Sequence, residues 1–372
     1  LCSMYQEPSG VRIMAYTTID DPSAYFHIQL YTGSSSGQSI TNDANAGDFK
    51  PDWVWIKRRD GDPNSVGNGH NSLYDSSRGV TKEIYSDLNN AEATNSNALT
   101  AFGTDGFTVG TEARVNSNGL AFVAWQWKCN GGTTTSFTES GNNPGGTIQT
   151  NTTAGFSIIT TTGTGATGTI AHGLGAVPHW WISKQRSNAE NWSVYHVNNT
   201  SAPETEILTL NTGDATADNA NAYNDTAPTS TNLTVHTKNE VNTNGRTYVH
   251  YVFIPIQGFS KFGSYNGNGD ADGPFVYLGF KPAWLMIKRT DSSSDGWYIF
   301  DSTRSPTNLV DKAIRANASN VESGESIDLL SNGFKHRIGG NNNFNNASGT
   351  YIYMAFAEHP FVSSEGVPVT AR

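Results

Sequence analysis

The sequence contains the same seven-residue pattern three times, and this repetition constrains the fold more than any other feature. The pattern is P-x-W-x-x-x-K, and the filler residues differ between the copies. A shared spacing with different filler is typical of an internal repeat, which has to be identified before single elements are assigned. The copies are Pro51, Trp53 and Lys57; Pro178, Trp180 and Lys184; and Pro282, Trp284 and Lys288.

Two further landmarks keep the same register. Each copy ends in a glycine followed by a run of aromatic and aliphatic residues. These glycines, Gly119, Gly245 and Gly349, lie 68, 67 and 67 residues after the prolines of the pattern. A short strand-like segment ending in glycine precedes each proline by 18, 15 and 15 residues. Three landmarks in register predict three tandem homologous units, each of a size typical of a domain.

The spacing of apolar residues predicts an all-β fold. Short alternating segments separated by Gly, Asn, Asp and Thr clusters are typical of strands joined by tight turns. Residues 351–356 alternate aromatic with aliphatic side chains, so we expect this strand to be covered on both faces. Residues 81–91 are the best helical candidate in the first unit. We therefore expect three tandem homologous β-sandwich domains of jelly-roll type.

Shifts in composition mark the boundaries between the units. The stretch from 129 to 153 is poor in apolar residues and rich in Gly, Thr and Asn, which is typical of a linker. The expected organisation is a leader or disordered start at 1–13, a first repeat at 14–128, a linker at 129–153, a second repeat at 154–257, a third repeat at 258–361 and an extended C-terminal tail at 362–372.

The composition excludes several classes of function. The net charge is −10 and the basic clusters are no longer than Lys57–Arg59, so nucleic acid is not an expected partner. No run of eighteen apolar residues is present, so we expect no membrane insertion. The two cysteines, Cys2 and Cys129, leave a disulfide between them open, but they do not have metal-ligand spacing. We expect no metal and no cofactor.

Two loop motifs match ligand-binding signatures in spelling only. Gly163-x-Gly165-x-x-Gly168 matches the dinucleotide fingerprint, but no helix follows to receive a phosphate, so a hairpin turn is the preferred interpretation. Asp270 and Asp272 lie in an oxygen-rich loop that suits calcium. No glutamate twelve residues further on completes an EF-hand, and a solvated turn is therefore preferred.

The remaining polar motifs favour structural roles. Asp75–Arg78 and Asp301–Arg304 share a D-x-x-R pattern that either clamps a ligand or fixes a loop. Loop fixation is favoured, because arginine offers a planar fork to a carboxylate. His172, His179 and His196 cluster only in the second unit and lack the carboxylates that a metal site or general base needs. No pair of carboxylates recurs at matching positions, as glycoside hydrolysis would require. We expect no catalytic residues and no enzymatic activity.

The nine tryptophans could either stack on sugar rings or pack a core. Trp53, Trp180 and Trp284 recur at the one position that defines the repeat, which favours core packing. Binding residues are therefore expected in the loops that the units do not share, although no single residue is identified. These loops are residues 59–71, 211–232 and 337–347.

Several stretches carry a resemblance to a known family. They are MAYTTIDDPSAYF at 14–26, DFKPDWVWIKRRDG at 48–61, AGFSIITTTGTGATGTIAHGLGAVP at 154–178, GFKPAWLMIKRTDSSSDGWYIFDSTR at 279–304, SGTYIYMAFAEHPF at 348–361 and the closing PFVSSEGVPVTAR. Together they cover most of the chain. The units resemble virion proteins of marine tailed bacteriophages, which are usually described as tail-fibre-like or uncharacterised. No catalytic motif is attached to that family.

The resemblance implies a structural protein on the exterior of a bacteriophage particle. We expect a tail fibre, tail-tip or knob-like component that mediates attachment to the host surface. A capsid decoration protein is the main alternative, and a polysaccharide-degrading tailspike is the second. The expected partners are other virion proteins, including further copies in a homotrimer, and a host cell-surface glycan or protein. The expected location is the virion surface, after assembly in the host cytoplasm.

Overall fold

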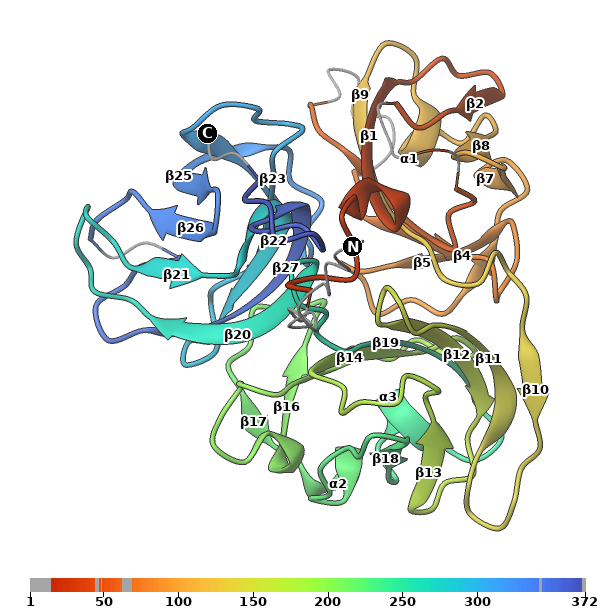
Figure 1. Ribbon diagram of the computed structural model, residues 1–372. Coiled ribbons are helices and arrows are strands. Elements are labelled where there is room, and N and C mark those ends of the chain that lie inside the picture. Colours follow the sequence, from red (N-terminus) through yellow and green to blue (C-terminus); the bar gives the residue numbers. More distant parts are fainter. Residues whose placement is uncertain (1–14, 44–46, 48, 62–68, 341–342, 370–372) are drawn as a thin grey trace, which may run out of the picture.

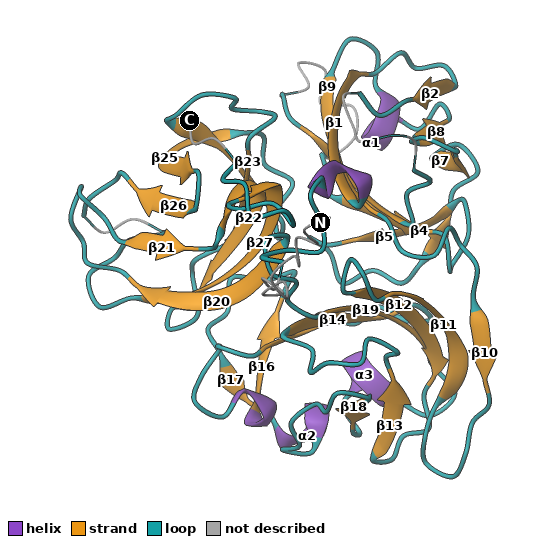
Figure 2. Cartoon of the chain, viewed as in Figure 1, coloured by secondary structure: helices purple, strands orange, loops and turns teal. Residues whose placement is uncertain are grey.

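The computed structural model describes residues 15–43, 47, 49–61, 69–340 and 343–369. Strands dominate this part of the chain and the helices are single turns (Figure 2), so the prediction of an all-β fold is confirmed. Figure 1 shows three lobes around a common centre, one for each sequence unit. The helical turns are η1 (Pro22–Ala24), α1 (Ala113–Asn116), η2 (Pro203–Thr205), α2 (Ala220–Tyr223) and α3 (Asn239–Asn242).

The first unit forms one large and one small antiparallel sheet from its described residues. The strand order is β1-β9-β3-β4-β5-β6 in the large sheet and β2-β8-β7 in the small one. The strands are β1 (Phe26–Thr32), β2 (Gln38–Ile40), β3 (Trp53–Arg58), β4 (Ser72–Asp75), β5 (Lys82–Tyr85), β6 (Ala93–Thr94), β7 (Leu99–Phe102), β8 (Phe107–Val109) and β9 (Ala121–Trp127).

The second unit repeats this arrangement and adds strands at one edge. Its large sheet has the order β10-β11-β12-β19-β14-β15-β16-β17, and β13 pairs with β18 in a separate ribbon. The strands are β10 (Thr135–Phe137), β11 (Gly145–Asn151), β12 (Phe156–Thr162), β13 (Gly168–Ala171), β14 (Trp180–Gln185), β15 (Trp192–His196), β16 (Glu206–Thr209), β17 (Ala217–Asp218), β18 (Asn232–Val235) and β19 (Thr247–Phe253).

The third unit joins all its described strands into one curved sheet. The order is β20-β27-β22-β23-β24-β25-β26-β21. The strands are β20 (Ser260–Asn266), β21 (Phe275–Tyr277), β22 (Phe280–Arg289), β23 (Trp297–Asp301), β24 (Val310–Arg315), β25 (Ser323–Leu330), β26 (Gly333–His336) and β27 (Thr350–Pro360).

The three large sheets contain the same succession of five strands. In each, the last strand of the unit lies between its first strand and the strand that carries the repeated tryptophan. The residue register is also shared, because the repeated tryptophan always pairs with the last aromatic residue of the inserted strand. These pairs are Trp53 with Trp127, Trp180 with Phe253, and Trp284 with Phe356.

The large sheets enclose one central core, and each also covers an outer core of its own. The central core contains residues of all three units, including Trp53, Trp180 and Trp284. On β27, Ile352 faces the central core and Tyr353 faces the outer core of the third unit, so the expected covering of residues 351–356 on both faces is confirmed. Three independently folded tandem domains would not share a core in this way.

Residues 129–153, expected to be a linker, contain the strands β10 and β11. β11 pairs along the whole of β12, and β10 pairs with β11 at the outer edge of the sheet (Figure 1). An edge position needs few apolar side chains, because backbone hydrogen bonds hold the strand to its neighbour. Ile148 is the one large aliphatic residue of β11, and it packs against the outer core of the second unit.

Two other local expectations differ from the structure. Residues 81–91 begin with β5 rather than a helix, because Ile84 enters the central core and the strand pairs with β4. The tail is not extended, since it turns back at 363–366, where Ser363 N donates to Val367 O at 2.9 Å. The expected leader at 1–13 lies outside the described residues.

The first described residues pack on the third unit and thereby join it to the first. Tyr16 donates its hydroxyl hydrogen to Gly279 O of the third unit at 2.9 Å, and Thr17 donates to the O atom of Gln257, the last residue of the second unit, at 2.8 Å. Ser364 N donates to the Asp20 carboxylate at 2.6 Å. The two ends of the described chain therefore meet beside the same sheet.

Candidate functional site

The repeated tryptophans lie at the centre of the molecule and not on its surface. Trp53, Trp180 and Trp284 have no exposed area, and the prolines of the pattern are also buried. The same holds for the other six tryptophans of the chain, which are all at most 2% exposed. Stacking of tryptophan on a sugar is thereby excluded for this folded state, and the role in core packing agrees with the sequence interpretation.

The repeated lysines connect each unit to a neighbour. Lys57 Nζ donates to Ser319 O in the third unit at 3.1 Å, and Lys184 Nζ to Asn89 O in the first at 3.1 Å. Lys288 Nζ donates to Gly213 O in the second unit, also at 3.1 Å. Burial lowers the pKa of each of these lysines to about 8. The three bonds form a closed head-to-tail ring of units. The first unit donates to the third, the third unit donates to the second, and the second unit donates to the first.

A second set of hydrogen bonds follows the same ring. Trp192 and Trp297 lie opposite the repeated lysine, and Asn71 directly precedes β4, one residue beyond the pair Ile56–Ser72. Each acceptor is the carbonyl of the last residue of a strand in the neighbouring unit. A heterologous contact that closes after three steps produces such a ring. The bonds are Asn71 Nδ2 to Arg315 O at 3.0 Å, Trp192 Nε1 to Tyr85 O at 2.7 Å and Trp297 Nε1 to Thr209 O at 3.0 Å.

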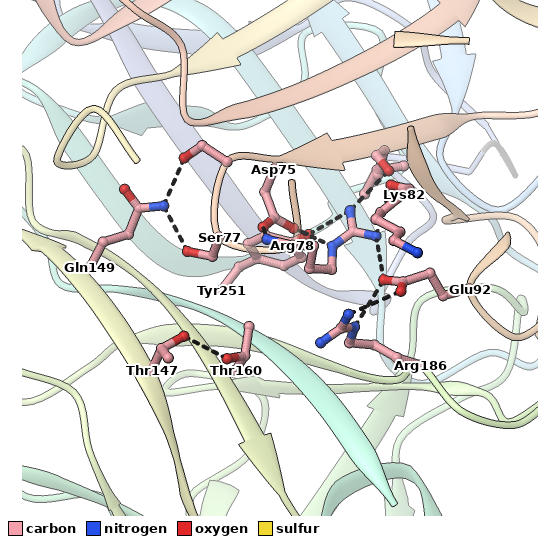
Figure 3. A network of polar contacts seen from close by, with 12 residues as sticks. Asp75, Ser77, Arg78, Lys82, Glu92, Thr147, Gln149, Thr160, Arg186 and Tyr251 are labelled. Atoms are coloured by element: carbon pink, nitrogen blue, oxygen red, sulfur yellow. Dashed lines mark hydrogen bonds and ion pairs between the residues drawn. The ribbon is translucent and has the colours of Figure 1, made fainter. Parts of the chain in front are cut away.

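A buried ionic network joins the first and second units (Figure 3). The side chains of Asp75 and Arg78 are fully buried and form an ion pair, and Arg78 also donates to Glu92 at 3.1 Å. Glu92 accepts two hydrogen bonds from Arg186, at 2.8 and 2.9 Å, and Tyr251 donates to Asp75 at 2.6 Å. Burial acts to lower the pKa of Arg78, but the neighbouring anionic groups, Asp75 first, outweigh burial and raise it.

The contact between the third and first units repeats this network. Arg304 donates to Asp301 at 2.5 Å and to Glu322 at 3.3 Å, and Arg59 donates to Glu322 at 2.7 Å. Trp125 Nε1 donates to Asp301 at 3.0 Å, in the place of the Tyr251 hydroxyl. Both D-x-x-R pairs are therefore enclosed between units, which matches the loop-fixing interpretation and leaves no access for a ligand.

The contact between the second and third units lacks this network. His196 replaces the aspartate, and Met354 stands where the other units have Trp125 or Tyr251. His196 Nε2 donates to Tyr353 O at 3.1 Å. Burial lowers the pKa of His196 to about 3, so its imidazole is neutral. Small threonines, Thr216 and Thr290, replace the Glu–Arg pair, although the backbone bond from Thr216 N to Thr290 O is kept at 2.9 Å.

Two open grooves lie between the units. Groove A, of about 540 Å³, separates β1 of the first unit from the third unit. Groove B, of about 420 Å³, lies where the ionic network is missing, between the second unit and β20. Groove A is lined by Phe26–Leu30, Asp21, Asp43, Ser302, Thr303 and Glu358, among others. Groove B is lined by Asn198, Asn199, Thr216, Ser264, Thr290 and Asp291, among others.

The other candidate residues are dispersed. Gly163–Gly168 does not form a hairpin, because β12 and β13 belong to different sheets and the loop connects them. Asp272 is in an exposed turn and pairs with Lys335 at 2.7 Å. His172 is buried and bonds to Thr229 O at 3.1 Å. Among the described residues, no group of three or more His, Cys, Asp or Glu side chains is placed to hold a metal ion.

The cysteines and the divergent loops are described only in part. Cys129 is a buried free thiol in the central core, and Cys2 lies outside the described residues. Residues 62–68 and 341–342 of the expected binding loops also lie outside them. The loop at 211–232 contains β17 and α2. Within the described part of the chain, no helix is long and apolar enough to cross a membrane.

One repeated position was missed from the sequence. Asn116, Asn242 and Asn345 are fully buried, and each holds a loop through its side-chain amide. The available signal was an apolar residue followed by Asn, with the Asn three or four residues before the glycine. Gly119 and Gly245 adopt positive φ, but in the third unit Ser348 does so, with φ 65°, and Gly349 follows it.

Comparison with known proteins places the chain in a family without assigning it an activity. A search of curated proteins and a search of solved structures both gave no match. One family model, described as a domain of unknown function, matches residues 21–360, which include all three units and the contacts between them. The chain therefore belongs to the DUF7483 family.

Proposed function

We propose that the protein is a structural component on the exterior of a tailed-bacteriophage particle, where it takes part in attachment to the host surface without catalysis. The observation that carries the proposal is the closed ring of contacts among the three units. The repeated lysines and both D-x-x-R pairs serve this ring. These conspicuous polar residues therefore support the body and are not presented to a substrate.

A framework of this kind is suited to binding a partner by shape complementarity. Two grooves and several polar loops remain open on a framework whose units are fixed by buried hydrogen bonds. Pre-formed surfaces lose little conformational freedom on binding, so a modest contact area can give useful affinity. The resemblance of the repeats to virion proteins of marine phages supports the same assignment.

The test is a density map of the whole particle in which the copies of this protein are counted and located. We expect a small number of copies at the tail or at fibre attachment points. Hundreds of copies in icosahedral positions would contradict the attachment role and indicate capsid decoration. Light scattering of the purified protein measures the expected homotrimer directly.

A binding experiment tests the attachment step separately. Fluorescently labelled protein should bind susceptible host cells and should reduce phage adsorption when added in excess. Cells selected for resistance to the phage are the matched control, and they should bind less protein. Equal binding to susceptible and resistant cells would contradict a role in attachment.

A further inference from the structure

The first strand of the first unit has an open edge in groove A. β1 has a single neighbouring strand, β9, in the described structure. Tyr25 O accepts from Lys128 N, and Gly33 N donates to Leu120 O, so the odd-numbered residues of β1 bond to β9. The alternate residues, such as Phe26 and Ile28, therefore turn their backbone N–H and C=O groups towards the groove.

The equivalent edge of the second unit is covered by a strand. β12 corresponds to β1, because Phe156 and Phe26 pair with equivalent aromatic residues of β19 and β9. β11 pairs with the free edge of β12, with Gln149 opposite Ile158. In the second unit, β11 thus occupies the position beside the first strand that is empty in groove A of the first unit.

The covering strand is also recognised by the neighbouring unit (Figure 3). Gln149 Nε2 donates to Ser76 Oγ at 2.8 Å and to Ser77 Oγ at 2.7 Å, and both serines belong to the first unit. The amide therefore links the added strand to the loop that follows β4. Backbone pairing holds the strand, and this pair of hydroxyls fixes its register.

Groove A presents the same pair of hydroxyls without an amide. Ser302 and Thr303 follow Asp301 as Ser76 and Ser77 follow Asp75, and both line groove A. Their hydroxyls make no hydrogen bond to any described residue. An open strand edge and two unoccupied hydroxyls thus face each other across the groove, in the positions that hold β11 elsewhere.

We propose that groove A is an acceptor site for an extended strand supplied by a partner protein. The strand pairs antiparallel with β1 and places a Gln or Asn side chain between Ser302 and Thr303. Asp21 and Asp43 line the groove, so basic residues beside the amide add favourable charge. Strand addition at an exposed sheet edge is an established mode of peptide recognition.

This inference rests on the proposed function only in taking the partner to be another protein of the particle. Strand acceptance itself is a property of the isolated chain and is measured without the virion. If the peptide experiment below fails while the particle map shows tail copies, only the acceptor site is lost. If the peptide binds and the map shows a capsid lattice, only the attachment role is lost.

The probe is a fluorescent peptide with the sequence of residues 144–152, PGGTIQTNT, measured by anisotropy against the full-length protein. In β11 the N–H groups of Thr147 and Gln149 point at β12, and those of Ile148 and Thr150 point away. Peptides N-methylated at Thr147 and Gln149 should lose binding. Peptides N-methylated at Ile148 and Thr150 have the same composition and should retain it. Absence of binding by the unmodified peptide would overturn the proposal.

A matched pair of protein variants separates groove A from the site of β11. Ser302→Ala with Thr303→Ala should weaken peptide binding about tenfold, because two neutral hydrogen bonds are lost. Ser77→Ala changes the equivalent hydroxyl under β11 and should leave the affinity unchanged. The reverse pattern would show that the peptide displaces β11, and it would overturn the assignment to groove A.

The source of the strand is tested by sedimentation of the protein alone. We expect the sedimentation coefficient to stay the same when the unmodified peptide is added. Self-association that the peptide disperses, and that Ser302→Ala with Thr303→Ala also weakens, would identify a second copy as the occupant. That result would overturn the assignment to a different partner protein.

Discussion

The Tyr251 hydroxyl of the second unit donates a 2.6 Å hydrogen bond to the buried Asp75 carboxylate of the first. Asp75 is also paired with Arg78, so its charge is compensated by one cation and one neutral donor that come from different units. A buried carboxylate without such partners is costly. Where the chain has His196 instead of this aspartate, the donor position is taken by Met354, which has no hydrogen to give.

Tyr251→Phe should lower the free energy of unfolding by about 1–3 kcal/mol, because the buried carboxylate loses a hydrogen-bond donor. Chemical denaturation measures the change. Tyr195→Phe is the control, since the Tyr195 hydroxyl makes no hydrogen bond within the described structure. Equal effects of the two substitutions would show that the bond to Asp75 contributes nothing.

Arg78→Met should be more damaging, at about 3–5 kcal/mol, because it leaves Asp75 buried without a counter-charge. Combining Arg78→Met with Asp75→Asn should recover part of the loss. A double-mutant cycle on the unfolding free energies gives the coupling directly. Additive losses would contradict the ion pair as the stabilising element.

Trp284→Ala should cost about 3–5 kcal/mol, the usual effect of removing a large buried aromatic side chain. Because Trp284 packs in the core shared by all three units, the loss should appear as one cooperative transition. Trp284→Phe should cost much less, since Trp284 Nε1 makes no hydrogen bond that the change would break. Unfolding of the third unit alone, with the others intact, would contradict a shared core.

Acid should destabilise the protein through three buried histidines. Burial lowers the pKa of His196, His250 and His336 from 6.5 to about 3. Between pH 6.5 and 3 the unfolded chain binds protons that the folded protein does not, so stability is fully present above pH 6.5 and falls as the pH drops. Each histidine adds a slope of about 1.4 kcal/mol per pH unit. His250→Gln should reduce the combined slope by about a third, and an unchanged slope would exclude His250 as a contributor.

Mild alkali should stabilise the protein through the repeated lysines. The folded-state pKa of Lys57, Lys184 and Lys288 is about 8, against 10.5 ordinarily. Between these values the unfolded chain retains protons that the folded protein has lost, so stability rises with pH from about 8. Above about pH 10 buried tyrosines such as Tyr74, whose pKa is raised by burial, reverse the trend. Thermal unfolding from pH 7.5 to 10 measures the rise, and Lys57→Met should reduce it by about a third.

The contact between the second and third units can be strengthened by introducing the Glu–Arg pair that the other two contacts contain. Thr216→Glu with Thr290→Arg places a Glu–Arg pair across the same backbone bond that joins Glu92 and Arg186. We expect a gain of about 0.3–1 kcal/mol, the range of a partly exposed ion pair. Either single substitution should give no gain. A double change no better than the sum of the singles would contradict the equivalence of the contacts.

The sequence supports the strands of the repeat well, because their signal is local. A proline, a tryptophan and a lysine at fixed spacing, together with alternation every second residue, are sufficient to place β3, β14 and β22. The central core could not be predicted in this way. Whether Trp53 or Phe356 faces another unit depends on how the sheets pack against each other. The two-residue alternation along a strand does not contain that information.

The failures have separate physical causes. β10 and β11 were missed because strands at and next to the edge of a sheet rely on backbone pairing and carry few apolar residues, so 129–153 resembled a linker. Residues 82–85 have a helix-compatible composition, but pairing with β4 and burial of Ile84 decide their conformation. The positive φ of Ser348, next to the landmark Gly349, has no signal in the sequence. The grooves arise between units and have no sequence signature.

The contacts at the two ends of the described chain determine how the body responds to tension. A force that pulls the chain from both sides would first reach the bonds of Tyr16 to Gly279 and of Thr17 to Gln257. The bond between Asp20 and Ser364 lies further along the chain and would be loaded after them. The sheets themselves carry no load until these have parted. A particle tethered through this protein would therefore extend first at these few hydrogen bonds, before any of the three sheets of the protein is strained.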